Sequence, residues 1–129
     1  MTLPGSRQPM NQLPWREPQQ LAAALQQRYG HQGLVWLDGD GSQRGRYAVL
    51  AAGPSEQVRC DGLPNDSGAS DPFAALQKAF ARGPGHWLGW LSYEAAAWIE
   101  PGDHWHRPAM AQLWAGHYAV VIELDLQER

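Results

Sequence analysis

Residues 34–53 read LVWLDGDGSQRGRYAVLAAG, two apolar runs separated by a cluster of glycine, aspartate and serine. Apolar runs on either side of turn-forming residues are typical of two strands joined in a β-hairpin. We therefore expect residues 34–38 and 46–53 to pair as antiparallel strands, across a loop longer than the tightest hairpin turns. This hairpin makes an antiparallel sheet the starting point for the fold.

A first helix is expected over residues 18–29, immediately before the hairpin. Pro18 suits the first helical turn, where the missing N–H costs nothing. Gly30 is a typical C-terminal stop. One apolar stripe runs along the segment at intervals of four residues: Leu21, Leu25 and Tyr29.

A second helix is predicted after residue 71, where the helix start and stop signals are the clearest in the sequence. Asp71 is a good N-cap and Pro72 follows at the first helical position. The pair Gly83-Pro84 ends the segment. Its apolar stripe consists of Phe73, Leu76 and Phe80.

Further strands are expected at residues 56–60, 85–91 and 113–126. In GHWLGWLSYEAAAWIEP (85–101), the strand runs into a short helix after Tyr93-Glu94, and Gly85 and Gly89 are expected at close backbone approaches. The run LWAGHYAVVIELDL (113–126) predicts one long strand covered on both faces. Without regular βαβ spacing, the chain is expected to be an α+β protein with a mostly antiparallel sheet and two main helices. Within the strand expected at residues 85–91, Trp87 and Leu91 should share one face, and Leu88 and Trp90 should share the other.

Length and composition predict one domain. The 129 residues fit a flexible N-terminal lead-in (1–17) and a single α+β domain (18–129). The net charge of −3, with scattered cations, argues against nucleic acid and anionic membranes as partners. Cys60 is the only cysteine, which indicates a reducing compartment and predicts a cytoplasmic protein. Cys60 itself is interpreted as a strand-end cysteine without a nucleophilic role.

The sequence does not match the common motifs of metal-binding, nucleotide-binding and hydrolytic sites. The loop that begins at Asp38 resembles a calcium loop, but Gln43 and Val49 stand where glycine and a bidentate glutamate are needed. His104 and His106 lack a third ligand at a diagnostic spacing and are interpreted as loop histidines. Walker and GxSxG motifs do not occur. We therefore predict no catalytic residues and no metal site in this chain.

Five segments in order resemble the N-terminal domain of component I of the chorismate-utilising synthases, the anthranilate synthase and aminodeoxychorismate synthase family. They are LVWLDG (34–39), RGRYAVLAAGP (44–54), DPFAAL (71–76), GHWLGWLSYE (85–94) and LWAGHYAVVIELD (113–125). The chain departs from the family pattern at Ala95–Ala97, where glycine and arginine usually follow the tyrosine-acid pair. The resemblance implies the fold of that N-terminal domain.

The resemblance also implies more polypeptide than these 129 residues. In the family, this domain precedes a catalytic domain that binds chorismate and Mg²⁺, and a glutamine amidotransferase subunit supplies ammonia. The chain is then expected to be an N-terminal fragment that is not catalytic alone. An isolated fragment of this kind should expose apolar surface and dimerise or aggregate.

The family's N-terminal domain holds L-tryptophan in some members, as an inhibitor or a structural ligand. By resemblance, the ligand-binding residues here are Leu37, Asp38, Arg46 and Tyr47. Asp38 replaces the usual serine and would pair with a ligand ammonium group. A structural alternative for Arg46 is an ion pair across the turn with Asp38 or Asp40.

Three functions stay open from the sequence. The first is the non-catalytic N-terminal domain of an aminodeoxychorismate synthase component I-like protein, in the synthesis of 4-aminobenzoate for folate. The second is the tryptophan-regulatory domain of an anthranilate synthase, and the third is a stand-alone α+β binding or scaffold protein. The missing serine at Asp38 favours the first.

Overall fold

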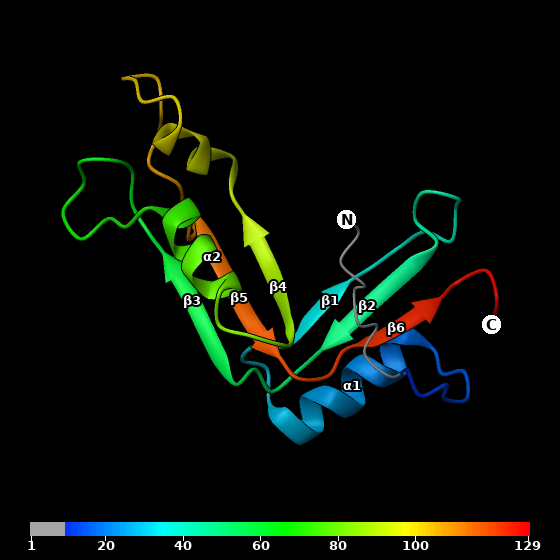
Figure 1. Ribbon diagram of the computed structural model, residues 1–129. Coiled ribbons are helices and arrows are strands. Elements are labelled where there is room, and N and C mark those ends of the chain that lie inside the picture. The colour runs from blue at the N-terminus through cyan, green and yellow to red at the C-terminus, as the bar shows by residue number, and fades with distance from the viewer. Residues whose placement is uncertain (1–9) are drawn as a thin grey trace, which may run out of the picture.

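The computed structural model describes residues 10–129, and residues 1–9 of the predicted N-terminal lead-in lie outside that part. Figure 1 labels the elements in chain order. They are α1 (Pro18–Tyr29), β1 (Val35–Leu37), β2 (Tyr47–Ala51), β3 (Glu56–Cys60), α2 (Pro72–Phe80), β4 (His86–Leu91), the 3-10 helix η1 (Tyr93–Trp98), β5 (Leu113–Tyr118) and β6 (Ile122–Asp125).

The strands form two three-stranded antiparallel sheets, which we call sheet A (order β1-β2-β6) and sheet B (order β3-β5-β4). The β1–β2 hairpin and the α+β class are confirmed. Because β2 leads directly into β3, and β5 into β6, neighbouring strands of sheet B continue into neighbouring strands of sheet A across one corner. Figure 1 shows the two sheets diverging from this corner as the arms of a V.

The expectation of one long strand over residues 113–126 is wrong. The segment breaks at residues 119–121, so that β5 belongs to sheet B and β6 to sheet A. Val120, predicted at the centre of a doubly covered strand, is 74 % exposed. A strand that passes from one sheet to another turns the corner by such a bend, and its residues leave both sheets there.

Helix α1 covers one face of sheet A, on the outer side of the V in Figure 1. Its bounds match the prediction, and Gly30 follows it with a positive φ of 82°. The buried side chains beneath it come from β2 and β6, namely Ala48, Leu50 and Leu124. Three helical residues and Trp15 pack against them: Leu21, Ala22 and Leu25.

Helix α2 covers one face of sheet B. The Asp71 carboxylate accepts hydrogen bonds from the backbone N–H groups of Phe73 at 2.9 Å and Ala74 at 3.4 Å, which confirms the predicted N-cap. Ala75 and Leu76 pack on the buried strand residues Cys60, Leu113 and Ala115. Cys60 is the last residue of β3, as predicted, and the structure shows that it is buried.

The two sheet faces without a helix meet at the corner, and we call their joint surface the concave face. Alternation along the strands places nine apolar residues on it: Val35, Leu37, Tyr47, Val49, Ala51, Leu88, Trp90, Trp114 and Tyr118. Val35, Ala51 and Tyr118 are buried together at the corner. The Tyr118 hydroxyl donates a hydrogen bond to the Gly33 carbonyl at 2.5 Å, which ties sheet B to the chain before β1.

Strand β4 confirms the predicted use of glycine. A Cβ added to Gly89 would lie 2.6 Å from the Ala115 Cα atom, and a Cβ on Gly85 would enter the His117 ring. Trp87 and Leu91 share the α2 face, while Leu88 and Trp90 lie on the concave face, also as predicted. The predicted short helix follows as η1.

Candidate functional site

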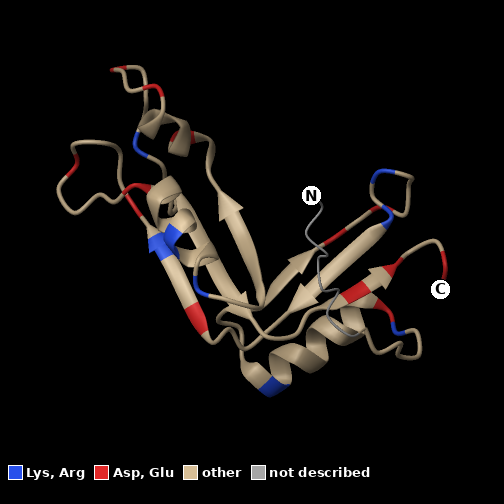
Figure 2. Cartoon of the chain, in the orientation of Figure 1, with Lys and Arg blue, Asp and Glu red and all other residues tan. Residues whose placement is uncertain are grey.

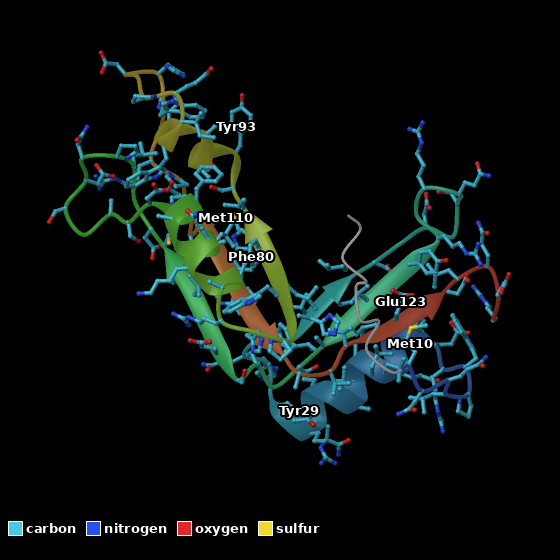
Figure 3. All side chains as sticks on the ribbon, in the orientation of Figure 1. Met10, Tyr29, Phe80, Tyr93, Met110 and Glu123 are labelled. Carbon is cyan, nitrogen blue, oxygen red and sulfur yellow. The ribbon has the colours of Figure 1, made fainter. Side chains whose placement is uncertain are left out.

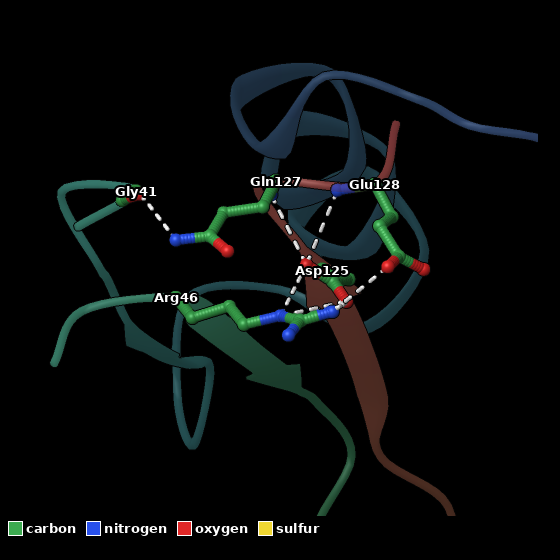
Figure 4. Close-up of polar contacts among 5 residues, drawn as sticks. All are labelled: Gly41, Arg46, Asp125, Gln127 and Glu128. Carbon is green, nitrogen blue, oxygen red and sulfur yellow. Dashed lines mark hydrogen bonds and ion pairs between the residues drawn. The ribbon is translucent and has the colours of Figure 1, made fainter. Parts of the chain in front are cut away.

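Arg46 is held at the start of β2 by acidic groups from the far end of the chain. Its Nε lies 2.9 Å from Oδ1 and 3.0 Å from Oδ2 of Asp125, and one terminal nitrogen lies 2.5 Å from Oδ2. The same terminal nitrogen is 3.3 Å from the Glu128 carboxylate (Figure 4). The alternative that Arg46 pairs with Asp38 or Asp40 is therefore wrong, because β6 lies beside β2 and brings Asp125 closer.

This ion pair sets the protonation of both partners. The hydrogen bonds from Arg46 lower the pKa of Asp125 from 3.8 to about 2, and backbone N–H groups of Gln127 and Glu128 add to the effect. The Asp125 carboxylate in turn raises the pKa of Arg46 above its already high ordinary value. Both groups stay charged over the physiological range, so Arg46 serves as a structural cation in this arrangement.

Leu37 and Tyr47 lie on the concave face of sheet A. Leu37 on β1 stands opposite Val49 on β2, and Tyr47 lies two residues before Val49 on β2. The side chains of Leu37 and Tyr47 are therefore diagonal neighbours. They are 45 % and 48 % exposed. The Arg46 guanidinium lies 5.2 Å from the Tyr47 ring centroid. These predicted ligand residues thus present an open, apolar and aromatic surface.

Asp38 points to a different place. It lines a shallow pocket of about 190 Å³ between the hairpin loop and the start of α1, together with Trp15, Pro18, Gly39, Leu126 and Arg129. Its carboxylate accepts a hydrogen bond from the Gly39 N–H at 3.0 Å and has no ion-pair partner among residues 10–129. The four predicted ligand residues therefore do not line one cavity.

The hairpin loop uses its other acidic residue to hold its own turn. The Asp40 carboxylate accepts the Ser42 N–H at 2.9 Å, and the Gly41 N–H bonds the Gly45 carbonyl at 2.8 Å. Hydrogen bonds from Ser42 lower the pKa of Asp40. The loop is thereby a closed turn whose polar groups satisfy one another.

A larger pocket of about 400 Å³ lies between the loop after β3 and the loop before β5, away from the predicted site residues. Two arginines line it, but each faces an acid. Arg59 bonds Asp61 at 2.8 Å and Arg107 lies 3.3 Å from Asp66. The hydrogen bond from Arg59 lowers the pKa of Asp61, and the Leu63 N–H, with a smaller contribution from Arg107, lowers the pKa of Asp66. The two ion pairs neutralise the charges that line the pocket.

Residues 10–129 contain no group of three or more histidine, cysteine or acidic side chains placed to hold a metal ion. His104 and His106 lie in the predicted loop beyond η1, both exposed. The His104 ring packs at 4.8 Å from Trp105 instead of converging with other ligands.

Sequence reasoning missed a hydrogen-bonded chain at the corner. Ser55 Oγ lies 2.9 Å from Nδ1 of His117, whose Nε2 lies 3.0 Å from the Pro84 carbonyl. A serine-histidine pair with an oriented ring has the parts of a nucleophile and its base. However, neither pocket described above includes these residues. We therefore interpret the hydrogen bonds as structural contacts that fasten His117 of β5 to the loop before β4. Ser55 and His117 are 62 positions apart, and no local pattern links them.

Comparison with known proteins finds no matching family model, curated protein or solved structure. Within the described part of the chain, no helix combines the length and apolar character needed to cross a membrane.

Proposed function

We propose that this chain is the non-catalytic N-terminal domain of an aminodeoxychorismate synthase component I-like protein, and that its concave face packs on the catalytic domain. The supporting observation is that helices cover one face of each sheet, while the opposite, helix-free face is also apolar at its centre. An antiparallel sheet with one face in water normally alternates apolar and polar residues. Here the face opposite the helices carries leucine, valine and aromatic side chains at its centre.

The distribution of charge on the concave face supports the same proposal. The charged residues of the concave face lie on outer strands of the two sheets. They are Arg59 on β3, and Glu123 and Asp125 on β6. Figure 2 shows the central strands β2 and β5 without charged residues. An apolar centre with a polar rim is the usual anatomy of a protein interface.

The resemblance supplies the partner in this proposal. The segments that carry it contain β1, β2, β4, β5 and β6 and the start of α2, but not β3, so they form most of the framework that presents the concave face. In the family, the catalytic domain binds chorismate and Mg²⁺, and an amidotransferase delivers ammonia. On this proposal the metal belongs to the catalytic domain, and this chain contributes shape and apolar area.

The decisive experiment begins with the reading frame after codon 129, which should encode a chorismate-binding domain. That domain, produced separately, should bind the 129-residue chain in calorimetry and form aminodeoxychorismate from chorismate and ammonium. Tyr47→Asp should weaken binding at least tenfold, because it places a charge on the concave face. Tyr93→Asp is the matched control, since Tyr93 is 84 % exposed and lies beyond β4 in η1 (Figure 3). A downstream frame without such a domain, or equal effects of both variants, contradicts the proposal.

An amino-acid ligand is part of the proposal at the hairpin. Asp38 has a carboxylate free of ion pairs within residues 10–129, whereas Arg46 would have to leave Asp125 to meet a ligand carboxylate. Calorimetry of the intact synthase with L-tryptophan separates the two branches. Tight binding with loss of activity indicates the anthranilate branch, and the absence of both effects supports the aminodeoxychorismate branch.

A further inference from the structure

Two polar groups are buried where sheet B meets η1. The pairing of β4 with β5 continues one step past Leu91 and Leu113, so that the Ser92 N–H bonds the Gln112 carbonyl at 2.8 Å. On its other side, the Gln112 N–H bonds the Cys60 carbonyl at 2.9 Å. Gln112 is thereby fixed in the sheet by both neighbouring segments, and the residue is fully buried.

The orientation of the Gln112 carboxamide follows from its contact with η1. The Trp98 indole Nε1 lies 2.8 Å from Gln112 Oε1. An indole N–H can only donate, so the amide oxygen must face Trp98 and the amide nitrogen Nε2 must point away from it. Gln112 Nε2 and Ser92 Oγ are both buried, and neither has a hydrogen-bond partner among residues 10–129. Two buried polar groups on directly opposed residues therefore remain to be satisfied.

Buried polar groups without a partner are rare, because each one costs free energy unless the protein or an ordered water satisfies it. The buried residues of η1, Ala95 and Ala97, have methyl side chains and offer no polar side-chain group. Trp87 Nε1 is also buried without a partner in the described part of the chain, but it belongs to the α2 face. Alternation along the strands sets Ser92 and Gln112 on the opposite face, so these two form a pair of their own.

We propose that Ser92 Oγ and Gln112 Nε2 together bind one buried water molecule, which fastens η1 to sheet B. The water oxygen accepts a hydrogen bond from the Gln112 amide, and the water makes a second hydrogen bond with the Ser92 hydroxyl. A buried water needs at least two polar partners, and it can join groups that do not bond each other directly. Because Gln112 also accepts the Trp98 indole N–H, the water completes a network between the sheet and the 3-10 helix.

Water fits this site better than an ion or an organic ligand. Both groups are uncharged, so a buried ion would find no counter-charge on them. Neither Ser92 nor Gln112 lines the two pockets described above, which argues against an organic molecule. The amide nitrogen can only donate and the hydroxyl can donate or accept, and a water molecule complements both. The inference does not depend on the proposed synthase function.

The test counts long-lived water molecules in the 129-residue chain by magnetic relaxation dispersion of the water oxygen nucleus, which does not exchange with protein hydroxyl groups. Ser92→Ala removes one partner of the water. Ser55→Ala is the matched control, because Ser55 Oγ is exposed and already bonded to His117. We expect Ser92→Ala to lose the contribution of one water relative to the wild type and Ser55→Ala to keep it, with both variants folded by circular dichroism. Equal dispersion in the wild type and Ser92→Ala overturns the proposal, as does the same loss in both variants.

A high-resolution crystal structure of the wild-type chain supplies a readout that needs no substitution, and it decides the question if Ser92→Ala does not fold. We expect one solvent peak within about 3.2 Å of both Ser92 Oγ and Gln112 Nε2. A direct hydrogen bond between these two groups, a protein group in the place of the solvent peak, or no peak between them overturns the proposal.

Discussion

Arg46 and Asp125, 79 positions apart in the sequence, form a two-pronged ion pair that fastens the start of β2 to the end of β6. The side chains are 33 % and 24 % exposed. Asp125 also accepts the backbone N–H groups of Gln127 and Glu128, and Gln127 donates to the Gly41 carbonyl at 3.0 Å (Figure 4). One carboxylate thereby organises the open end of sheet A.

Protonation of Asp125 should destabilise the fold at low pH. Its pKa in the folded state, about 2, lies below the ordinary value of 3.8, so the carboxylate contributes stability above pH 4 that is lost as the pH falls through 2. We expect Asp125→Asn to lower the Tm by a few degrees at pH 7 and to have little effect at pH 2. Thermal unfolding at both pH values measures this difference. Glu128→Gln is the control, because Glu128 is 80 % exposed and should matter little. Equal Tm losses in Asp125→Asn at pH 2 and pH 7 would contradict the assignment.

Gly89 should not tolerate even a methyl group. A Cβ there would lie 2.6 Å from the Ala115 Cα atom and closer still to the Trp114 carbonyl oxygen. We expect Gly89→Ala to lower the free energy of unfolding by about 1–3 kcal/mol, as overpacking does, in urea denaturation. Gly102→Ala meets only the His104 ring and should change stability much less. If the two variants are equally stable, β4 and β5 do not approach as described.

Asp71 should stabilise α2 through its side chain alone. Because its carboxylate accepts two N–H groups of the first helical turn, Asp71→Ala should cost about 1 kcal/mol in urea denaturation. Asp71→Ser keeps an acceptor at the N-cap and should recover most of that loss. No difference between the alanine and serine variants would show that the cap contributes nothing.

The helices and β3 were predictable from sequence because their signals are local. Pro18 and Gly30 bracket α1, and Asp71 with Pro72 starts α2, so each boundary depends on a few adjacent residues. The alternation within β4 likewise follows from its own six residues. These predictions needed no knowledge of what lies across the sheet.

The corner and the site were not predictable in the same way. Val120 and Val121 are β-branched, as is typical of a strand, and residues 119–121 contain no glycine or proline, so the break between β5 and β6 has no clear local signal. The bend arises because β5 and β6 pair with different neighbours. Arg46 depends on the same long-range pairing, which is why its partner is Asp125 and not an acid of its own loop.

Tyr118 should stabilise the corner through its hydroxyl group as well as its ring. The side chain is fully buried, and burial raises the pKa of Tyr118 to about 12, so the hydroxyl remains a donor to the Gly33 carbonyl at ordinary pH. Tyr118→Phe should lower the free energy of unfolding by about 1–3 kcal/mol, because the carbonyl loses its partner. Tyr93→Phe, at a site 84 % exposed, is the matched control and should be neutral. An equally neutral Tyr118→Phe would mean that water replaces the hydroxyl at no cost.

The concave face should bind an apolar dye in the isolated chain. Leu37, Tyr47 and Trp90 are each between 42 % and 48 % exposed on this face, and contiguous apolar surface of that kind takes up fluorescent dyes such as ANS. We expect Leu37→Lys to reduce dye fluorescence substantially, and Val120→Lys to leave most of it, although Val120 is more exposed at 74 %. The reason is that Val120 lies at the bend between β5 and β6, outside both sheets. Urea unfolding confirms that each variant is native under the assay conditions. If Val120→Lys loses as much fluorescence as Leu37→Lys, the dye responds to scattered apolar residues. That result would contradict the description of the concave face as one continuous apolar surface.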